Sequence, residues 1–258
     1  MKRTIAIANQ KGGVGKTTTS VNLAASLASA GKRVLVVDLD PQANATSGLG
    51  FQRGTVTEGI YDAISAGRSL RELTQLTALG TLWLVPSTTD LAGAELELVA
   101  EPRREQRLKV AIAEVKDRYD YVIVDCPPSL GLLTLNALVA ADAVVIPMQC
   151  EYYALEGLSN LVRTIEQVKA QMNPTLAIEG ILLTMVDGRT SLTQQVESEV
   201  RSHFQGKVYT TTIPRNVRLA EAPSHGQPIV LYDKSSRGSQ SYLALAAEFL
   251  TRAEGAHP

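Results

Sequence analysis

Cysteine and aromatic residues are scarce in this chain. Only 5% of its 258 residues are aromatic, one residue is tryptophan, and the two cysteines are Cys126 and Cys150. Both cysteines lie at the ends of apolar runs, which predicts buried thiols in a reducing compartment. Two such separated cysteines argue against a disulfide framework or a cysteine-rich metal site.

Long apolar runs and an excess of charge are also absent. No stretch approaches the roughly 20 apolar residues that a membrane span needs. The apolar run at residues 4–8 is shorter than the roughly 7–15 residues of a secretory signal, so we expect a cytoplasmic protein. The formal net charge is −1, and a contact with nucleic acid therefore has to come from a local basic patch.

The remaining composition is that of an ordinary globular protein, with 45% hydrophobic and 20% charged residues. The length fits one large α/β domain or two small ones. Apolar runs typical of buried parallel strands cover residues 33–38, 82–87, 121–125, 143–147 and 178–185. Apolar residues at helical spacing cover residues 21–28, 155–172 and 239–251. We expect residues 253–258 to form a frayed tail.

The most informative stretch is glycine-rich and contains Lys11, Gly12, Gly13, Val14, Gly15, Lys16, Thr17 and Thr18. It follows a short apolar strand and opens a helical pattern, which is typical of a loop whose backbone N–H groups bind phosphates. In such a loop Lys16 reaches the β- and γ-phosphates and the Thr17 hydroxyl binds Mg²⁺. The standard pattern has a glycine where this chain has Gln10, and a second lysine, Lys11, starts the loop. A glycine-rich turn with solvated lysines is the alternative.

Aspartates end two of the expected strands. Asp38 and Asp40 follow one strand, at the edge where open α/β sheets bind ligands. Their alternatives are a helix cap or a solvated turn. Asp125 ends another strand and is followed by Cys126-Pro127-Pro128, which is typical of the Walker B arrangement that holds Mg²⁺. A plain aspartate at a strand end is the alternative there.

Together these motifs resemble the ParA/MinD class of deviant Walker A P-loop ATPases, and most closely the chromosomal ParA (Soj) partition ATPases. The resemblance covers residues 2 to about 252. It implies a single-domain α/β P-loop NTPase over residues 1–258, with a mostly parallel twisted β-sheet and helices on both faces. It also implies that Lys11 reaches the nucleotide of a second subunit, that Asp40 activates the attacking water, and that Asp38 lies near the loop and Mg²⁺.

The nucleotide base is expected to be adenine. The segment Thr184-Met185-Val186-Asp187 has methionine where guanine-binding proteins have a lysine in the second position, which favours ATP over GTP. By the resemblance, Met185, Pro214 and Asn216 belong to the adenine pocket. Glu151 lies in a segment that matches the family's dimer face.

The last quarter of the chain carries a small excess of positive charge. Between Lys207 and Arg237 there are five Lys or Arg residues against two acids. The resemblance implies a DNA-contacting surface formed by Arg189, Arg215, Arg218, Lys234 and Arg237. Without the resemblance these residues are typical of surface ion pairs.

The expected function follows from the resemblance. ATP and Mg²⁺ close a homodimer that binds double-stranded DNA nonspecifically at the nucleoid, and hydrolysis stimulated by a ParB-type centromere-binding protein releases it. A MinD-like membrane-associated positioning ATPase and a metal- or cluster-carrier protein are the alternatives. Residues 243–252 contain one Arg and one Glu, which indicates a packed helix rather than a lipid-binding one, so we expect no stable membrane association.

Overall fold

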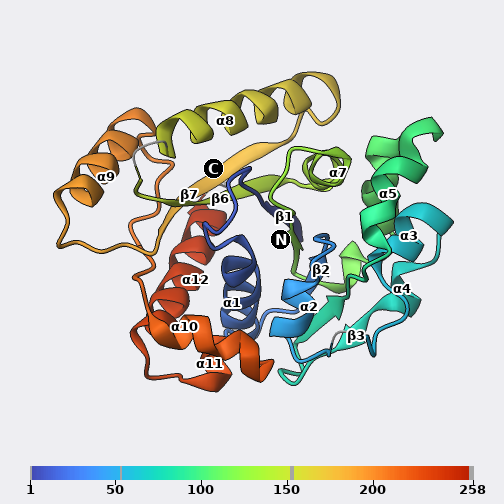
Figure 1. Ribbon diagram of the computed structural model, residues 1–258, viewed down its shortest axis with the longest axis horizontal. Coiled ribbons are helices and arrows are strands. Elements are labelled where there is room, and N and C mark those ends of the chain that lie inside the picture. The colour runs from blue at the N-terminus through green and yellow to red at the C-terminus, as the bar shows by residue number, and fades with distance from the viewer. Residues whose placement is uncertain (1, 53, 152–153, 256–258) are drawn as a thin grey trace.

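The computed structural model describes residues 2–52, 54–151 and 154–255, and a central sheet runs through it (Figure 1). The order of its seven strands is β3-β4-β2-β5-β1-β6-β7. The strands are β1 (Arg3–Ile7), β2 (Val34–Asp38), β3 (Gln75–Leu76), β4 (Leu82–Val85), β5 (Tyr121–Asp125), β6 (Ala143–Gln149) and β7 (Ala177–Thr184). All neighbours are parallel except the short pair β3 and β4, which is antiparallel.

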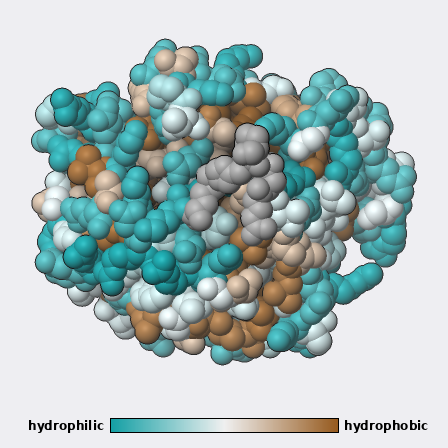
Figure 2. Space-filling view, turned by 180° about the vertical axis from the view of Figure 1, so that it is seen from behind, coloured by the Kyte–Doolittle hydropathy of each residue, from teal (hydrophilic) through white to brown (hydrophobic). Residues whose placement is uncertain are grey.

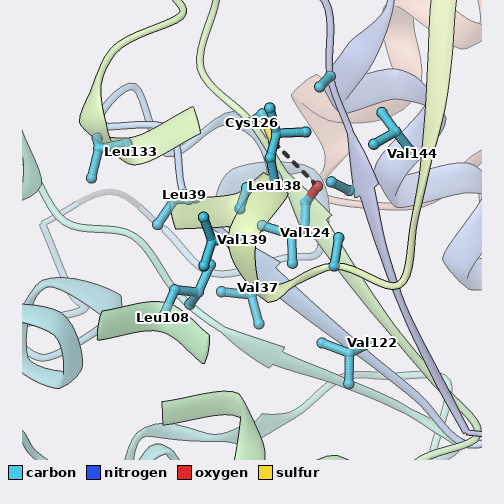
Figure 3. Packing of buried hydrophobic residues seen from close by; sticks show 14 of the residues in the cluster. Val37, Leu39, Leu108, Val122, Val124, Cys126, Leu133, Leu138, Val139 and Val144 are labelled. Carbon is cyan, nitrogen blue, oxygen red and sulfur yellow. Dashed lines mark hydrogen bonds between the residues drawn. The ribbon is translucent and has the colours of Figure 1, made fainter. Parts of the chain in front are cut away.

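The central strands are apolar on both sides because helices cover both faces of the sheet. Alternate residues of β2 point to opposite layers, with Leu35 and Val37 in one core and Val34 and Val36 in the other. In the first layer Val37 and Val124 lie close to Leu108 and Leu138 from the covering helices (Figure 3). This alternation explains why the strands appear in the sequence as nearly continuous β-branched runs.

The helices divide between the two faces according to the core that they join. One layer holds α1 (Lys16–Ser29), α2 (Asn44–Gly48), α10 (Val217–Glu221), α11 (Ile229–Tyr232) and α12 (Arg237–Gly255). The other holds α3 (Ile60–Ala66), α4 (Leu70–Leu73), α5 (Leu91–Glu97), α6 (Arg107–Ala113), α7 (Leu132–Ala140), α8 (Ala154–Gln171) and α9 (Ser191–His203). Short 3-10 helices are η1 (Leu98–Ala100), η2 (Arg104–Gln106), η3 (Lys116–Arg118) and η4 (Ala222–His225).

The α/β fold class with a mostly parallel sheet is confirmed. Helix α12 continues to Gly255, and Ala253 within it is 5% exposed. The frayed tail expected over residues 253–258 stays a prediction, since residues 256–258 lie outside the described part. Hydrophilic residues cover most of the rear face (Figure 2). In the described ranges no helix is both long and apolar enough to cross a membrane.

Candidate active site

The glycine-rich loop leaves β1 and enters α1 through two residues in the left-handed region. Gly13 has φ 75° and Gly15 has φ 85°, conformations that favour glycine over other residues. A Cβ at Gly15 would come no closer than 3.8 Å to Thr184, so the backbone conformation rather than crowding selects glycine there. The Thr184 hydroxyl at the end of β7 donates to the Val14 carbonyl at 2.8 Å. Strand β7 therefore fixes the curl of the loop.

The two lysines of the loop have different surroundings. Lys16 is 6% exposed, and its Nζ donates to the Lys11 carbonyl at 2.9 Å. Burial lowers the pKa of Lys16, while the charges of Asp125 and Asp40 oppose that shift. Lys11 is half-exposed and forms an ion pair with Glu151. One lysine is thus held inside the loop, and the other points to the surface beside Glu151.

Asp38 and Asp125 end the adjacent strands β2 and β5 in register, and both are fully buried. Ser20 Oγ donates to Asp125 Oδ1 at 2.7 Å, and the nearby Thr17 side chain acts to lower the pKa of Asp125. Asp125 Oδ2 has no hydrogen-bond partner among the described residues. Burial, and then the neighbouring Asp38, raise the pKa of Asp125 to about 8. A buried carboxylate oxygen without a protein donor, next to a threonine hydroxyl, fits a hard divalent cation such as Mg²⁺.

Asp38 differs from Asp125 because the chain itself supplies partners to both of its oxygens. Oδ1 accepts from the Asp40 N–H at 3.2 Å, and Oδ2 accepts from the N–H and the hydroxyl of Thr46, both at 2.7 Å. Burial raises the pKa of Asp38 to about 6. Asp40 is 6% exposed, and its Oδ1 accepts from the Gln42 N–H at 2.9 Å. The metal-site role expected of Asp38 stays a prediction.

A cavity of about 230 Å³ lies beside the loop and is lined by the three residues expected at the adenine, Met185, Pro214 and Asn216. Gly15 and Thr18 form its wall toward the loop. Met185 has φ 51°, a conformation that is uncommon for a residue with a side chain and is found at ligand sites. The structure therefore brings the expected base-binding residues together next to the expected phosphate-binding loop.

Three of the five expected DNA-contacting arginines and lysines surround a second, open hollow of about 940 Å³, namely Arg189, Arg215 and Arg237. Arg189 is bound by both oxygens of Asp187, at 2.8 and 2.7 Å, which lowers the pKa of Asp187 to about 2. In the part of the chain that the structure describes, neither Arg215 nor Arg237 forms an ion pair. We call this feature the basic hollow.

The other two expected contacts lie outside the basic hollow. Arg218 on α10 forms ion pairs with Glu221 at 2.9 Å and with Asp233 at 3.6 Å. Lys234 is exposed on the segment that precedes α12. The basic residues are therefore gathered on neighbouring elements. Arg215 forms no ion pair in the described ranges, but its charge helps to lower the pKa of Asp187 in the same hollow.

Comparisons with known proteins agree with this arrangement. The family profile described as "AAA domain" matches residues 2–178. The sporulation initiation inhibitor protein Soj of Bacillus subtilis (strain 168) is 59% identical over 248 residues, 96% of this chain and 98% of that protein. The chromosome partitioning protein ParA of Myxococcus xanthus (strain DK1622) is 58% identical over 250 residues, 97% of this chain and 88% of that protein. The chain belongs to the ParA/Soj family of chromosome-partitioning ATPases.

Solved structures share the fold of this ParA/Soj chain over nearly its whole length. Cobyrinic acid a,c-diamide synthase from Mycobacterium smegmatis with bound ADP and magnesium has a TM-score of 0.86, is 37% identical, and covers 98% of this chain and 96% of its own. The cell division ATPase MinD of Pyrococcus furiosus has a TM-score of 0.81 and is 25% identical over 97% of this chain and 99% of its own. Since one fold carries such different names, the higher identity to Soj and ParA decides the family.

Sequence reasoning missed two hydroxyl residues of the ParA/Soj site, Ser20 and Thr46. Ser20 lies one helical turn after Lys16 and faces Asp125, and this spacing was the available signal. Thr46 lies on α2, eight residues after Asp38, and reaches it only because the intervening loop folds back. No periodic pattern in the sequence indicates that the loop folds back to bring Thr46 to Asp38.

Proposed function

We propose that this ParA/Soj chain hydrolyses ATP with Mg²⁺ and uses the ATP-bound state to hold DNA. The observation that carries the proposal is the unpartnered, buried Asp125 Oδ2 beside Thr17 at the foot of the loop, next to the cavity of about 230 Å³. The loop N–H groups of Gly12, Gly13, Val14, Gly15, Lys16, Thr17 and Thr18 would bind the phosphates. The base would enter the cavity at Met185, Pro214 and Asn216.

Each side chain then has a role set by its place. The Lys16 ammonium would bind the β- and γ-phosphate oxygens, because it is already fixed over the loop by the Lys11 carbonyl. Thr17 and Asp125 would hold Mg²⁺, which when bound neutralises charge on the phosphates. Asp40 would orient the attacking water and accept its proton. Asp38 would lie near Mg²⁺ and would hold the backbone of Asp40 by accepting from the N–H of that residue.

Lys11 and Glu151 would act at a dimer face. Their ion pair is exposed, with side-chain exposures of 43% and 50%, and such pairs contribute only about 0–1 kcal/mol. Lys11 can therefore exchange Glu151 for the phosphates of a second copy at little cost. Two copies facing each other would each receive a lysine from the other, so dimerisation would depend on bound ATP.

DNA would bind across the basic hollows of the two subunits. One subunit offers a few unbalanced cations and the chain has a net charge of −1, so a single copy should bind DNA weakly. Joining two weak surfaces raises the effective affinity without a new contact. A ParB-type centromere-binding protein would stimulate hydrolysis, open the dimer and release the chain from the nucleoid.

The test is DNA binding by the purified chain with ATP, ADP or no nucleotide, at two salt concentrations and with DNA of arbitrary sequence. Binding that requires ATP and falls steeply with salt is the expected result. A parallel arm uses anionic liposomes in place of DNA. Liposome binding without DNA binding, by a chain that dimerises with ATP, would contradict the DNA role and favour a membrane-associated positioning ATPase.

A further inference from the structure

Thr46 joins three elements of the sheet edge by hydrogen bonds, and it is 1% exposed. Its hydroxyl donates to Asp38 Oδ2 at 2.7 Å and accepts from the Ser87 N–H at 3.0 Å. Its own N–H donates to the same Asp38 oxygen at 2.7 Å. Thr46 therefore links α2, the end of β2 and the segment after β4 through one side chain.

The far end of this chain of hydrogen bonds is Asp40. The second oxygen of Asp38 accepts from the Asp40 N–H at 3.2 Å, and the Asp40 carbonyl accepts from the Ala43 N–H at 2.9 Å. The segment after β4 is itself held, because Ile60 N–H donates to the Pro86 carbonyl at 2.8 Å. A fixed backbone group thus orients Thr46, Thr46 orients Asp38, and Asp38 orients the backbone of Asp40.

We infer that Thr46 is a positioning residue for ATP hydrolysis, acting through Asp38 on Asp40. The inference rests on the proposed function, which places the attacking water at Asp40. Displacement of a reacting group by about 1 Å can cost up to ~10²-fold in rate. The hydrogen bonds of Thr46 go to Asp38 and Ser87, and none joins it to the phosphate-binding loop in the described part of the chain. Loss of its hydroxyl should therefore slow hydrolysis and leave ATP binding intact.

The experiment compares Thr46→Val, which keeps the shape but removes the hydroxyl, with Thr46→Ser, which keeps the hydroxyl. The matched control is Thr77→Val, because Thr77 is also buried but donates to the Leu82 carbonyl at the β3–β4 edge, at 2.9 Å. Single-turnover hydrolysis of labelled ATP with Mg²⁺ gives the rate of chemistry, and equilibrium dialysis gives the Kd for ATP. We expect Thr46→Val to lower the rate ~10-fold with an unchanged Kd, and Thr46→Ser and Thr77→Val to stay near wild type.

Each other outcome has a defined meaning. If folded Thr46→Val hydrolyses ATP at the wild-type rate, the inference is overturned and the proposed function stands. The same holds if Thr46→Ser is as slow as Thr46→Val. An equal loss in Thr77→Val would show general destabilisation and also overturns it. If Thr46→Val does not fold, Thr46→Cys replaces it, and its weak thiol donor should give an intermediate rate. A wild-type chain no faster than Lys16→Ala overturns the proposed function and this inference with it.

Discussion

Lys16 is the residue on which nucleotide binding should depend most. Its ammonium is buried beside the loop and would make charged hydrogen bonds to phosphate oxygens, each contributing about 1.5–3 kcal/mol. We therefore expect Lys16→Ala to weaken ATP binding by at least ~10²-fold, measured by titration calorimetry. Lys169→Ala, on the exposed face of α8, is the control and should bind ATP normally. Unchanged ATP affinity in Lys16→Ala would contradict the assignment of the loop.

The pair Asp38 and Asp125 should make the nucleotide-free protein sensitive to pH. Burial raises both pKa values, to about 6 and about 8, so the folded state binds more protons than the unfolded state. The stabilising contribution is complete below the ordinary aspartate pKa of about 4 and is lost as the pH rises through about 8. We expect urea unfolding without Mg²⁺ to show falling stability between pH 5.5 and 8.5, and Asp125→Asn to flatten this fall. An unchanged slope in Asp125→Asn would contradict the raised pKa.

At the scale of elements, the arginines that line the basic hollow differ in whether they form ion pairs. Arg215 and Arg237 lie on different segments and form no ion pair in the described ranges, whereas Arg189 faces Asp187. Each phosphate contact adds about 0.9 to the slope of log K against log salt concentration. The double variant Arg215→Ala/Arg237→Ala removes two contacts from each subunit of the DNA-bound dimer, so it should lower that slope by about 3.6 in a DNA-binding titration with ATP.

The control for this prediction is Arg71→Ala, since Arg71 is exposed on the short helix α4 in the other layer. It should leave both the affinity and the slope unchanged. Equal slopes for the double variant and the wild type would place the DNA contacts elsewhere. Arg218→Glu is a second variant for the DNA-binding measurement. Arg218 pairs with Glu221 and Asp233, so a glutamate there would bring three carboxylates together and repel DNA. It should remove DNA binding and spare dimerisation.

The same scale shows how much the sequence could predict. The loop, its flanking strand and helix, and the strand-end aspartates are local patterns, and all were located from sequence to within a few residues. The expected strand at 82–87 ends at Val85, because Pro86 and Ser87 turn to bond Ile60 and Thr46 instead of a neighbouring strand. The two-residue strand β3 is too short for a period-2 pattern to mark it.

Side-chain partners from distant segments were beyond sequence reasoning. The pairing of Thr184 with the loop carbonyl of Val14 joins residues 170 positions apart. Arg189 and Arg218 form ion pairs, whereas Arg215 and Arg237 form none in the described ranges. This difference depends on where the acidic residues lie in the folded chain. Charge counts along the chain contain no such information, so the sequence could not tell which of the five expected contacts form ion pairs.

At the scale of the whole molecule, one subunit has half of what the proposed function requires. Its Lys11 lies beside its own Glu151, and its basic hollow carries few unbalanced cations. In the proposed dimer both features would become useful, because a second copy faces the first. Under the proposed function, the bound nucleotide would control DNA binding by controlling assembly of the dimer.

Asp40→Ala should hold the chain in this assembled state. The variant keeps Lys16, Thr17 and Asp125, so ATP and Mg²⁺ should bind, but the group assigned to the attacking water is gone. We expect a stable dimer with ATP and a monomer with ADP by light scattering coupled to size exclusion. Asp117→Ala, which removes only a surface ion pair with Lys2, is the control and should form a dimer that decays with hydrolysis.

Adding Lys11→Ala to Asp40→Ala tests the contact between subunits itself. If Lys11 reaches the phosphates of the second copy, the double variant should still bind ATP but remain monomeric, because each half of the interface loses its charged contact. Glu151→Gln, by contrast, removes only the competing partner within the chain and should leave the ATP dimer intact or strengthen it. A double variant that dimerises as well as Asp40→Ala would place the ATP-dependent contact at other residues, even though hydrolysis had been assigned correctly.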